Sequence, residues 1–359
     1  MTPGMLKLWR GRMPLAAALA LGWAGAAAAA AAEPSYDTYG SWLIACDNGL
    51  TCEAKGFEDG VAERPDLRLS RAAGPDAATT VTLTVPFTAE RDAVRVDGRP
   101  LSLAAPAWTV KQEDGLTTFA ADQPAAVADM LSRIRDAATL QVGTEEEGVV
   151  PLAGMMAALL RMDERQGRLD GVTALVPRGT APAAQVPAAP PLPAVPRFRP
   201  ATALSEAQGN ALIRRAKLAS AARFKAEECE ENDAQEADAT GAFALDERNA
   251  LVILPCGMGA YQGWSLVSIV PRTANGAPVP FRPVLPFRGN TPENSLTEPY
   301  FDPDTGILVF SAKGRGLADC GITAEWSWDG RQFQLRGAAF QDACGGSQPG
   351  DWPTLYRSR

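Results

Sequence analysis

Residues 244–254 read ALDERNALVIL, and residues 300–310 read YFDPDTGILVF. Each stretch has a short apolar segment, an acidic turn that begins at Asp246 or Asp302, and a continuous apolar run, which together are typical of a β hairpin. The two aspartates are 56 residues apart. Their matching surroundings predict an internal repeat in the second half of the chain.

Each hairpin is followed by segments of the same kind. These are a glycine-containing loop with a cysteine, a third apolar run (264–270 and 322–328), a turn (Asn275-Gly276 and Asp329-Gly330) and a fourth run (279–284 and 332–336). Asn-Gly and Asp-Gly supply the positive φ angles that tight hairpin turns require. We expect two pseudo-repeated four-stranded meanders, packed face to face or as neighbouring blades, with chance similarity among hairpins as the alternative.

The first half, residues 33–180, also has the pattern of short antiparallel strands. Runs at 42–46, 81–85 and 93–96 are apolar or β-branched, and the last leads into the turn Asp97-Gly98. Two helices are predicted, over 125–135 and 152–166, the second with Leu152, Met156, Leu159 and Leu160 on one face. The fold class is therefore mainly β with a few helices, and this half is a sandwich-like or barrel-like domain.

The segment 181–203 is rich in proline and alanine and divides the two halves. Proline removes backbone donors, so we interpret the segment as a semi-rigid linker, with a proline-rich recognition ligand as the alternative. Ser205 and Gln208 after it have the spacing of a capping box and predict a helix start. The predicted division is 1–32 signal peptide, 33–180 first domain, 181–203 linker and 204–359 second domain.

The first 32 residues have the pattern of a cleavable secretory signal. Lys7, Arg10 and Arg12 are followed by an apolar run and an alanine stretch that ends at Ala32. Cleavage before Glu33 is preferred over an uncleaved anchor, because the apolar core is shorter than the roughly 20 residues of a membrane span. We expect an exported, periplasmic or secreted protein with no membrane span after cleavage.

The six cysteines form an even set, as expected of an exported disulfide-bonded protein. Nearest-neighbour pairing gives Cys46–Cys52, Cys229–Cys256 and Cys320–Cys344. A zinc site is the competing interpretation, but the chain has no histidine and no CxxC pair.

Composition excludes several functions. Without the three basic residues of the signal, 31 basic residues remain against 42 acidic ones, a net charge of −11 that argues against nucleic acid and anionic lipid surfaces. The lack of histidine removes the usual general base and metal ligand. No glycine-rich phosphate loop is present, so no cofactor is expected. Paired-carboxylate hydrolysis remains open, with Asp163, Glu164 and Asp319 as candidate acids.

The loop 313–321 reads KGRGLADCG and is the most distinctive local feature. Lys313 and Arg315 lie between glycines that allow a ligand to approach the backbone, so the loop is a candidate site for a carboxylate or a sugar acid. The structural interpretation, which we favour, is a tight loop whose glycines supply positive φ and in which Asp319 pairs with Arg315 or caps the turn.

Three other features have structural interpretations that we favour over functional ones. The acidic residues around Cys229 (Glu227, Glu228, Glu230, Glu231, Asp233, Glu236 and Asp238) are interpreted as a solvated loop, and Asp302–Gly306 as a turn rather than a calcium loop. Of the aromatic residues Tyr261, Trp264, Trp326, Trp328 and Trp352, we expect most to be core, although exposed aromatics on β scaffolds can hold sugars.

Several motifs together resemble a known family. They are residues 39–48 with Cys52, residues 152–154 and 161–168, Pro255-Cys256 with 259–261, and 313–316 with 319–321 and 328–330. This set, spread over nearly the whole mature chain, resembles the exported Gram-negative family catalogued as domain of unknown function 1176. The first half is also similar to the invasion-associated locus B proteins, although their middle cysteine pair has no counterpart here. The resemblance implies compartment and architecture and supplies no catalytic residue.

The leading hypothesis from the sequence is a non-enzymatic binding or interaction protein of the cell envelope, whose ligand or protein partner and oligomeric state are unknown. The first alternative is a carboxylate-dependent hydrolase of envelope polysaccharide. The second is a structural envelope-stress factor.

Overall fold

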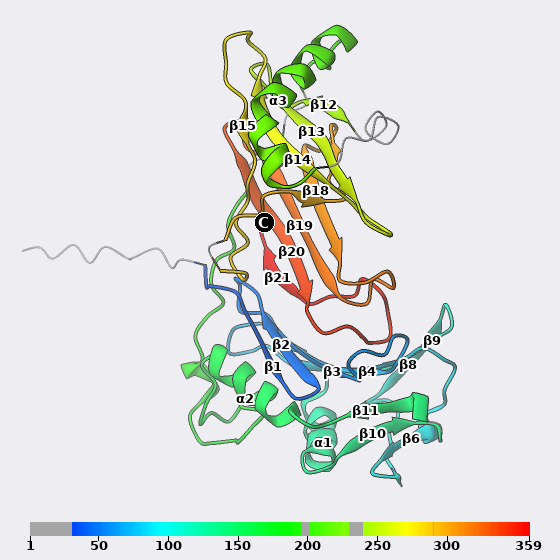
Figure 1. The fold of residues 1–359 in the computed structure, drawn as a ribbon. Helices are drawn as coiled ribbons and strands as arrows, with labels where there is room; N and C mark the ends of the chain where they lie inside the picture. Colours follow the sequence, from blue (N-terminus) through cyan, green and yellow to red (C-terminus); the bar gives the residue numbers. More distant parts are fainter. Residues whose placement is uncertain (1–30, 145, 196–197, 199–200, 230–239, 290) are drawn as a thin grey trace, which may run out of the picture.

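A computed structural model shows two β-rich halves placed end to end (Figure 1). It describes residues 31–359 except for 145, 196–197, 199–200, 230–239 and 290. The predicted signal peptide up to residue 30 and the acidic residues 230–238 therefore lie outside the described residues.

The first half is built on an open, antiparallel seven-stranded sheet with the strand order β1-β2-β3-β4-β5-β9-β8. Its strands are β1 (Ser35–Tyr39), β2 (Trp42–Cys46), β3 (Cys52–Phe57), β4 (Asp66–Arg71), β5 (Thr79–Val85), β8 (Thr109–Glu113) and β9 (Leu116–Ala121). Alternate residues such as Leu67 and Leu69 are fully buried on one face, as period-2 patterning requires.

A second, four-stranded sheet and two helices cover that face. The elements are η1 (Arg91–Ala93), β6 (Val94–Val96), β7 (Arg99–Pro100), α1 (Pro124–Ile134), β10 (Thr139–Val142), η2 (Glu146–Gly148), β11 (Val149–Pro151) and α2 (Met155–Arg165). Apolar residues of α1 and α2, such as Met130 and Leu159, join the sheet residues in one continuous core. This core is large enough to stabilise the first half.

The second half contains two open antiparallel sheets. The first has β12 (Gly241–Ala244), β13 (Asn249–Met258), β14 (Gly263–Pro271), β15 (Val279–Pro280) and β16 (Leu296–Thr297). The second has β17 (Tyr300–Asp302), β18 (Ile307–Lys313), β19 (Gly321–Trp328), β20 (Phe333–Gln341) and β21 (Thr354–Arg357). β12-β13-β14-β15 and β17-β18-β19-β20 follow the same meander order, which confirms the two predicted four-stranded meanders.

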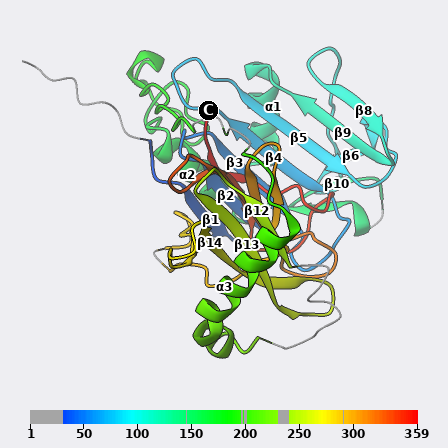
Figure 2. The same ribbon diagram turned by 90° about the horizontal axis from the view of Figure 1, so that it is seen from above.

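The two meanders pack face to face. Leu251, Ile253 and Val267 of one sheet share a core with Phe310 and Trp326 of the other. The outer face of the first sheet is covered by α3 (Glu206–Ala226), which lies across β12, β13 and β14 (Figure 2). The second half is therefore a three-layer arrangement of helix, sheet and sheet.

The capping box that predicted the start of α3 is present. The Ser205 side chain accepts from the backbone N–H of Gln208, and the Gln208 side chain accepts from the N–H of Ser205. The two other predicted helices also occur, α1 and α2, with ends one to three residues from the expected positions.

The segment after α2 runs along both halves. It contains η3 (Ala183–Gln185), its Val186 is buried, and its main chain exchanges hydrogen bonds with the C-terminal residue, from Arg359 N to Pro193 O and from Val195 N to Arg359 O. These contacts fix the described part of the segment to the body of the protein.

Three disulfides join Cys46 to Cys52, Cys229 to Cys256, and Cys320 to Cys344, the pairs expected from sequence spacing. None of them links the two halves. The described residues include no free cysteine.

One aromatic residue departs from expectation. Trp326, Trp328 and Trp352 are buried, but Trp264, expected in the core of its repeat, is only half-buried. Its indole lies over Gly257, which pairs with it across β13 and β14. Trp264 lies near the start of β14, between Gly257 and Thr297 of the short strand β16, and part of its ring is open to solvent.

Candidate functional site

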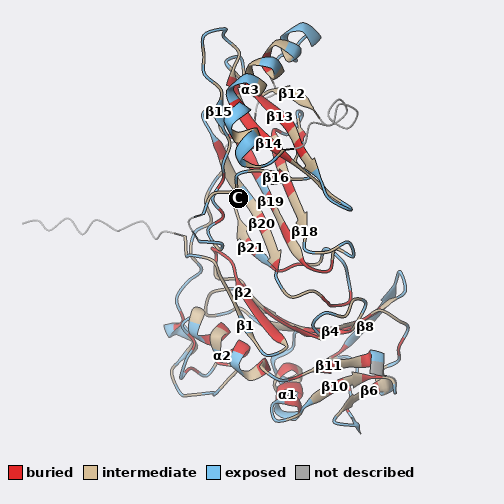
Figure 3. Ribbon diagram, viewed as in Figure 1, coloured by how far each residue is buried: buried red, intermediate tan, exposed pale blue. Residues whose placement is uncertain are grey.

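Strand β2 is buried along its whole length (Figure 3). In a sheet with one face in solvent, alternate residues would be exposed. One face of the sheet packs on the core of the first half, and the other meets the end of β20 and the loop 342–353 of the second half. The two halves therefore share an interface across β2, β3 and β4, which we call the junction.

The junction is polar and buried. Lys55 of β3 is fully buried, and its ammonium group donates to Gln341 Oε1 and to the main-chain oxygen of Asp351, each at 2.9 Å. Beside it, Arg68 binds both carboxylate oxygens of Asp351 at 3.2 and 2.5 Å, and Asp66 accepts from the N–H of Ser347 at 2.9 Å. Hydrogen bonds from one half thus satisfy charges supplied by the other.

Burial shifts the pKa values of two charged residues in the junction, Lys55 and Glu53. Burial away from water lowers the pKa of Lys55 by disfavouring its charged form, while the nearby carboxylate of Asp66 acts in the opposite direction. Burial likewise raises the pKa of Glu53, which Arg68 partly opposes. The junction therefore depends on paired charges at close contact.

Main-chain contacts continue the junction toward the solvent. The N–H of Gly60 donates to Cys344 O at 2.7 Å, and the N–H of Arg64 donates to Gly346 O at 3.3 Å, so that a short parallel bridge joins the halves. Gly345 makes this approach possible, because a Cβ there would lie 2.6 Å from Glu58 O and its φ is +154°.

The loop 313–321 reaches the same place. Arg315 donates through Nε and Nη2 to the two carboxylate oxygens of Asp319, with 2.8 Å for the Nε bond, and through Nη1 to Gly60 O at 3.0 Å. Asp319 is buried, and the hydrogen bonds from Arg315 hold its pKa below the usual range. The predicted Arg315–Asp319 pair therefore exists and ties the loop to the first half.

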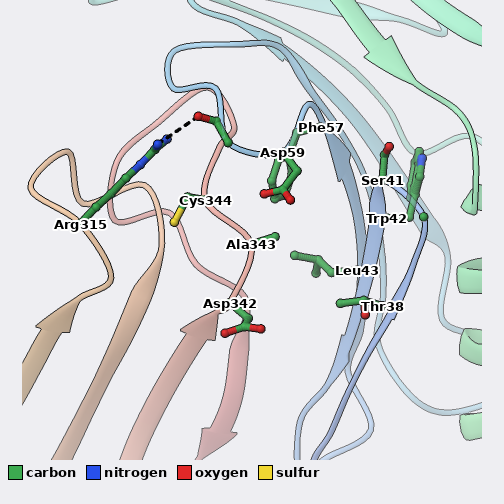
Figure 4. Close-up of a pocket in the computed structure, with 12 residues that line it drawn as sticks. Thr38, Ser41, Trp42, Leu43, Phe57, Asp59, Arg315, Asp342, Ala343 and Cys344 are labelled. Atoms are coloured by element: carbon green, nitrogen blue, oxygen red, sulfur yellow. Dashed lines mark hydrogen bonds between the residues drawn. The ribbon is translucent and has the colours of Figure 1, made fainter.

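Between these contacts lies a cavity of about 460 Å³, which we call the junction cavity (Figure 4). The turn between β1 and β2, the end of β3 and the end of β20 form its walls, together with the loop that carries Arg315. Its lining residues are Thr38, Gly40, Ser41, Trp42, Leu43, Phe57, Asp59, Gly60, Arg315, Asp342, Ala343 and Cys344. The volume lies in the range of sites for small molecules.

Negative charge dominates the cavity. Asp59 and Asp342 are both exposed, and no salt bridge joins either of them to a cation among the described residues. Both carboxylates interact electrostatically with Tyr36, whose hydroxyl accepts a hydrogen bond from the N–H of Asp342 at 3.0 Å. Burial raises the pKa of Tyr36 to about 12, and the charges of the two aspartates add to that shift. Arg315 brings one positive charge, already shared with Asp319.

Lys313, Arg315 and Asp319 of the predicted ligand loop lie at different positions relative to the junction cavity. Arg315 lines the cavity, and Asp319 lies behind it. Lys313 is absent from the lining; its main chain exchanges two hydrogen bonds with the side chain of Gln262, at 3.1 and 3.0 Å. The structure brings only one of the two predicted cations to the junction cavity.

A group of possible metal ligands lies beside the loop, since Asp319 and the sulfurs of Cys320 and Cys344 are within 4.8 Å of one another. The two sulfurs are bonded to each other, and Asp319 is bound to Arg315. Because a thiolate is the metal-binding form of cysteine, this group offers no ligand set in the oxidised protein.

Two further candidate acids have structural roles. Asp163 is fully buried: it binds Arg71 at 2.5 Å and accepts from the N–H groups of Leu175 and Val176. Glu164, by contrast, is exposed and pairs with Arg161. Asp163 therefore anchors the segment after α2.

The stretch that begins like a calcium loop forms a turn, as favoured from the sequence. The carboxylate of Asp302 accepts from the N–H of Asp304 at 2.9 Å and from the hydroxyl of Thr305 at 2.7 Å. Local hydrogen bonds thus engage this carboxylate.

Sequence reasoning missed Asp59, Asp342 and Tyr36. Asp59 belongs to an Asp-Gly turn and Asp342 directly follows a strand, so each is typical of an ordinary surface turn. For Asp342 the sequence offered one signal, its position two residues before Cys344.

These features define a disulfide-bonded, mainly β protein with a ligand-sized cavity between two halves. No helix among the described residues is both long and apolar enough to cross a membrane. The chain belongs to the family described as protein of unknown function (DUF1176), whose model matches residues 36–359. This confirms the resemblance seen in the sequence.

A curated relative is the uncharacterized protein YpfG of Escherichia coli (strain K12). The two are 32% identical over 344 residues, which cover 91% of this chain and 94% of the relative. No solved structure matches the chain.

Proposed function

We propose that this protein is an exported, non-enzymatic binding protein of the cell envelope and that its ligand occupies the junction cavity. Export is supported by the signal-like start of the sequence and by three disulfides, which persist in oxidising compartments. Binding is supported by a cavity of about 460 Å³ to which separate parts of the chain contribute.

The single observation that carries the proposal is the pair of unbridged carboxylates in the cavity, Asp59 and Asp342. Their charge favours a small ligand with an amine or another cationic group. Ser41 and Thr38 add hydroxyl groups, and Phe57 adds an apolar surface. A carboxylate ligand of the kind suggested by the loop 313–321 would have to compete with Asp319 and Gly60 O for Arg315.

Calorimetric titration of the oxidised protein against amino sugars, diamino-acid peptides and matched anionic sugars tests the proposal. We expect saturable binding of a cationic compound that the double variant Asp59→Asn/Asp342→Asn weakens by about tenfold or more. Asp76→Asn is the control, because Asp76 is exposed and does not line the cavity. Binding of the anionic sugars alone, or no binding by any compound, would contradict the proposal.

A second candidate is the carboxylate-dependent hydrolase of envelope polysaccharide, since two acids line one cavity. Both are exposed, however, whereas the acid of such enzymes needs an apolar environment to stay protonated. Release of reducing ends from peptidoglycan, abolished by Asp342→Asn, would favour the hydrolase. A structural envelope-stress factor, the third possibility, predicts no saturable ligand.

We also propose that residues 33–180 and 204–359 are two domains joined by the linker 181–203. No strand of the first two sheets belongs to a sheet of the second half, which supports this division. The similarity of the first half to the invasion-associated locus B proteins stays a prediction. Proteolysis within the linker should leave two fragments that co-migrate on size exclusion, because the junction holds them; separate elution would contradict the buried contacts described above.

A further inference from the structure

Tyr261 of the second half lies outside the core. Tyr261 is 47% exposed, whereas Trp326, Trp328 and Trp352 are buried. It belongs to the tip of the hairpin between β13 and β14, where the N–H of Gly259 donates to Gln262 O at 2.8 Å.

This hairpin tip is held rigidly. The amide side chain of Gln262 exchanges two hydrogen bonds with the main chain of Lys313, which ends β18. The next residues of the same loop lie against the aromatic ring, since a Cβ on Gly316 would be 3.7 Å from Tyr261 Cδ1. The backbone that carries the ring is therefore held in place before any ligand binds, which lowers the entropic cost of binding.

Tyr261 and Trp264 line a hollow of about 400 Å³ together with residues of the turn and of β16. Ser295 and Thr297 contribute hydroxyl groups, and Gly259 leaves main-chain atoms accessible. None of the residues that line this hollow carries a charge. Its chemistry thus differs from that of the acidic junction cavity, from which the loop 313–321 separates it.

Aromatic faces with a few hydroxyl and main-chain groups, and no charged side chain, suit a neutral ring that has both C–H and O–H surfaces. A phosphate, a nucleotide or a free amino acid would bring charges that nothing in the hollow neutralises. We propose that this hollow is a second binding site, independent of the junction cavity, that stacks a neutral sugar ring of an oligosaccharide on Tyr261.

The test is a glycan array that carries neutral and acidic oligosaccharides, followed by calorimetric titration of the oxidised protein with chitotetraose as the soluble neutral probe. We expect binding of neutral glycans, chitotetraose among them, and a loss of affinity of roughly fivefold or more in Tyr261→Ala, as for other aromatic anchors. Tyr261→Phe keeps the ring and should retain the affinity.

The matched control is Tyr300→Ala, which removes a tyrosine that is 63% exposed and does not line the hollow. The double variant Asp59→Asn/Asp342→Asn should leave glycan binding unchanged, so this site and the junction cavity can fail separately. The proposal is overturned if no neutral glycan binds, if only acidic glycans bind, or if Tyr261→Ala and Tyr300→Ala bind equally well. Melting curves of the variants verify that each one is folded.

Discussion

Replacement of Lys55 by methionine removes the charge at the centre of the junction and keeps an unbranched side chain that is one atom shorter. The variant leaves Gln341 Oε1 and the main-chain oxygen of Asp351 without their donor. It also removes a nearby positive charge from Asp66, which is 1% exposed and keeps Arg68 at 3.8 Å. Breaking a buried pair from one side costs about 3–5 kcal/mol. Because Arg68 compensates in part, we expect the lower end, about 3 kcal/mol.

Urea unfolding at 25 °C, followed by tryptophan fluorescence, measures this loss. With an unfolding entropy of about 0.7 kcal/mol/K for a chain of roughly 330 residues, the same loss lowers the melting temperature by about 4 °C. Lys111→Met is the matched control, because Lys111 is an exposed lysine that pairs only with Glu113 at the surface. Its effect should stay within about 0.5 kcal/mol. If Lys55→Met were as mild as the control, the junction would not hold the two halves together as described.

Three further predictions concern stability. Asp163→Asn should cost about 3 kcal/mol or more in urea unfolding, since it leaves a buried arginine uncompensated, whereas Glu164→Gln on the exposed side of the same helix should be nearly neutral. Tyr36 has a pKa raised to about 12 against 10.0 for an unperturbed tyrosine. Its stabilising contribution is therefore complete below pH 10 and is lost as the pH rises to 12. Tyr36→Phe should reduce this loss of stability, measured as urea midpoints between pH 10 and pH 12. Removal of the Cys320–Cys344 bridge by a double alanine substitution should cost about 3.4 kcal/mol for its separation of 24 residues, and a melting temperature unchanged by the substitution would contradict this.

The elements that the sequence predicted well are those with a local cause. The repeat was visible because Asp246 and Asp302 begin equivalent turns, and both carboxylates accept turn N–H groups in the structure. The start of α3 followed from Ser205 and Gln208, whose side chains need only each other's backbone. In each case the interaction spans three residues or fewer, so the chain itself encodes it.

The parts that could not be predicted depend on distant segments. Lys55 and Asp66 alternate with apolar residues on their strands, a pattern that normally indicates a solvent face. The same face is buried here because residues some 280 positions later cover it. The burial of Asp163 could not be predicted for the same reason, since its partner Arg71 is 92 residues away. A single sequence carries no local trace of such contacts.

The polar contacts of the junction affect whether the cavity is already formed before a ligand binds. A buried polar contact is a poor source of net stability compared with an apolar one, but it tolerates few alternative orientations, because every misplaced charge would remain unpaired. In the structure, Lys55, Asp66 and Arg68 all find hydrogen-bond partners in the opposite half. The Cys320–Cys344 bridge also ties the loop that carries Arg315 to the loop that pairs with residues 60–64. We therefore infer that the cavity is preformed rather than closed by a hinge, so that a ligand loses little free energy to rearrangement of the protein when it binds.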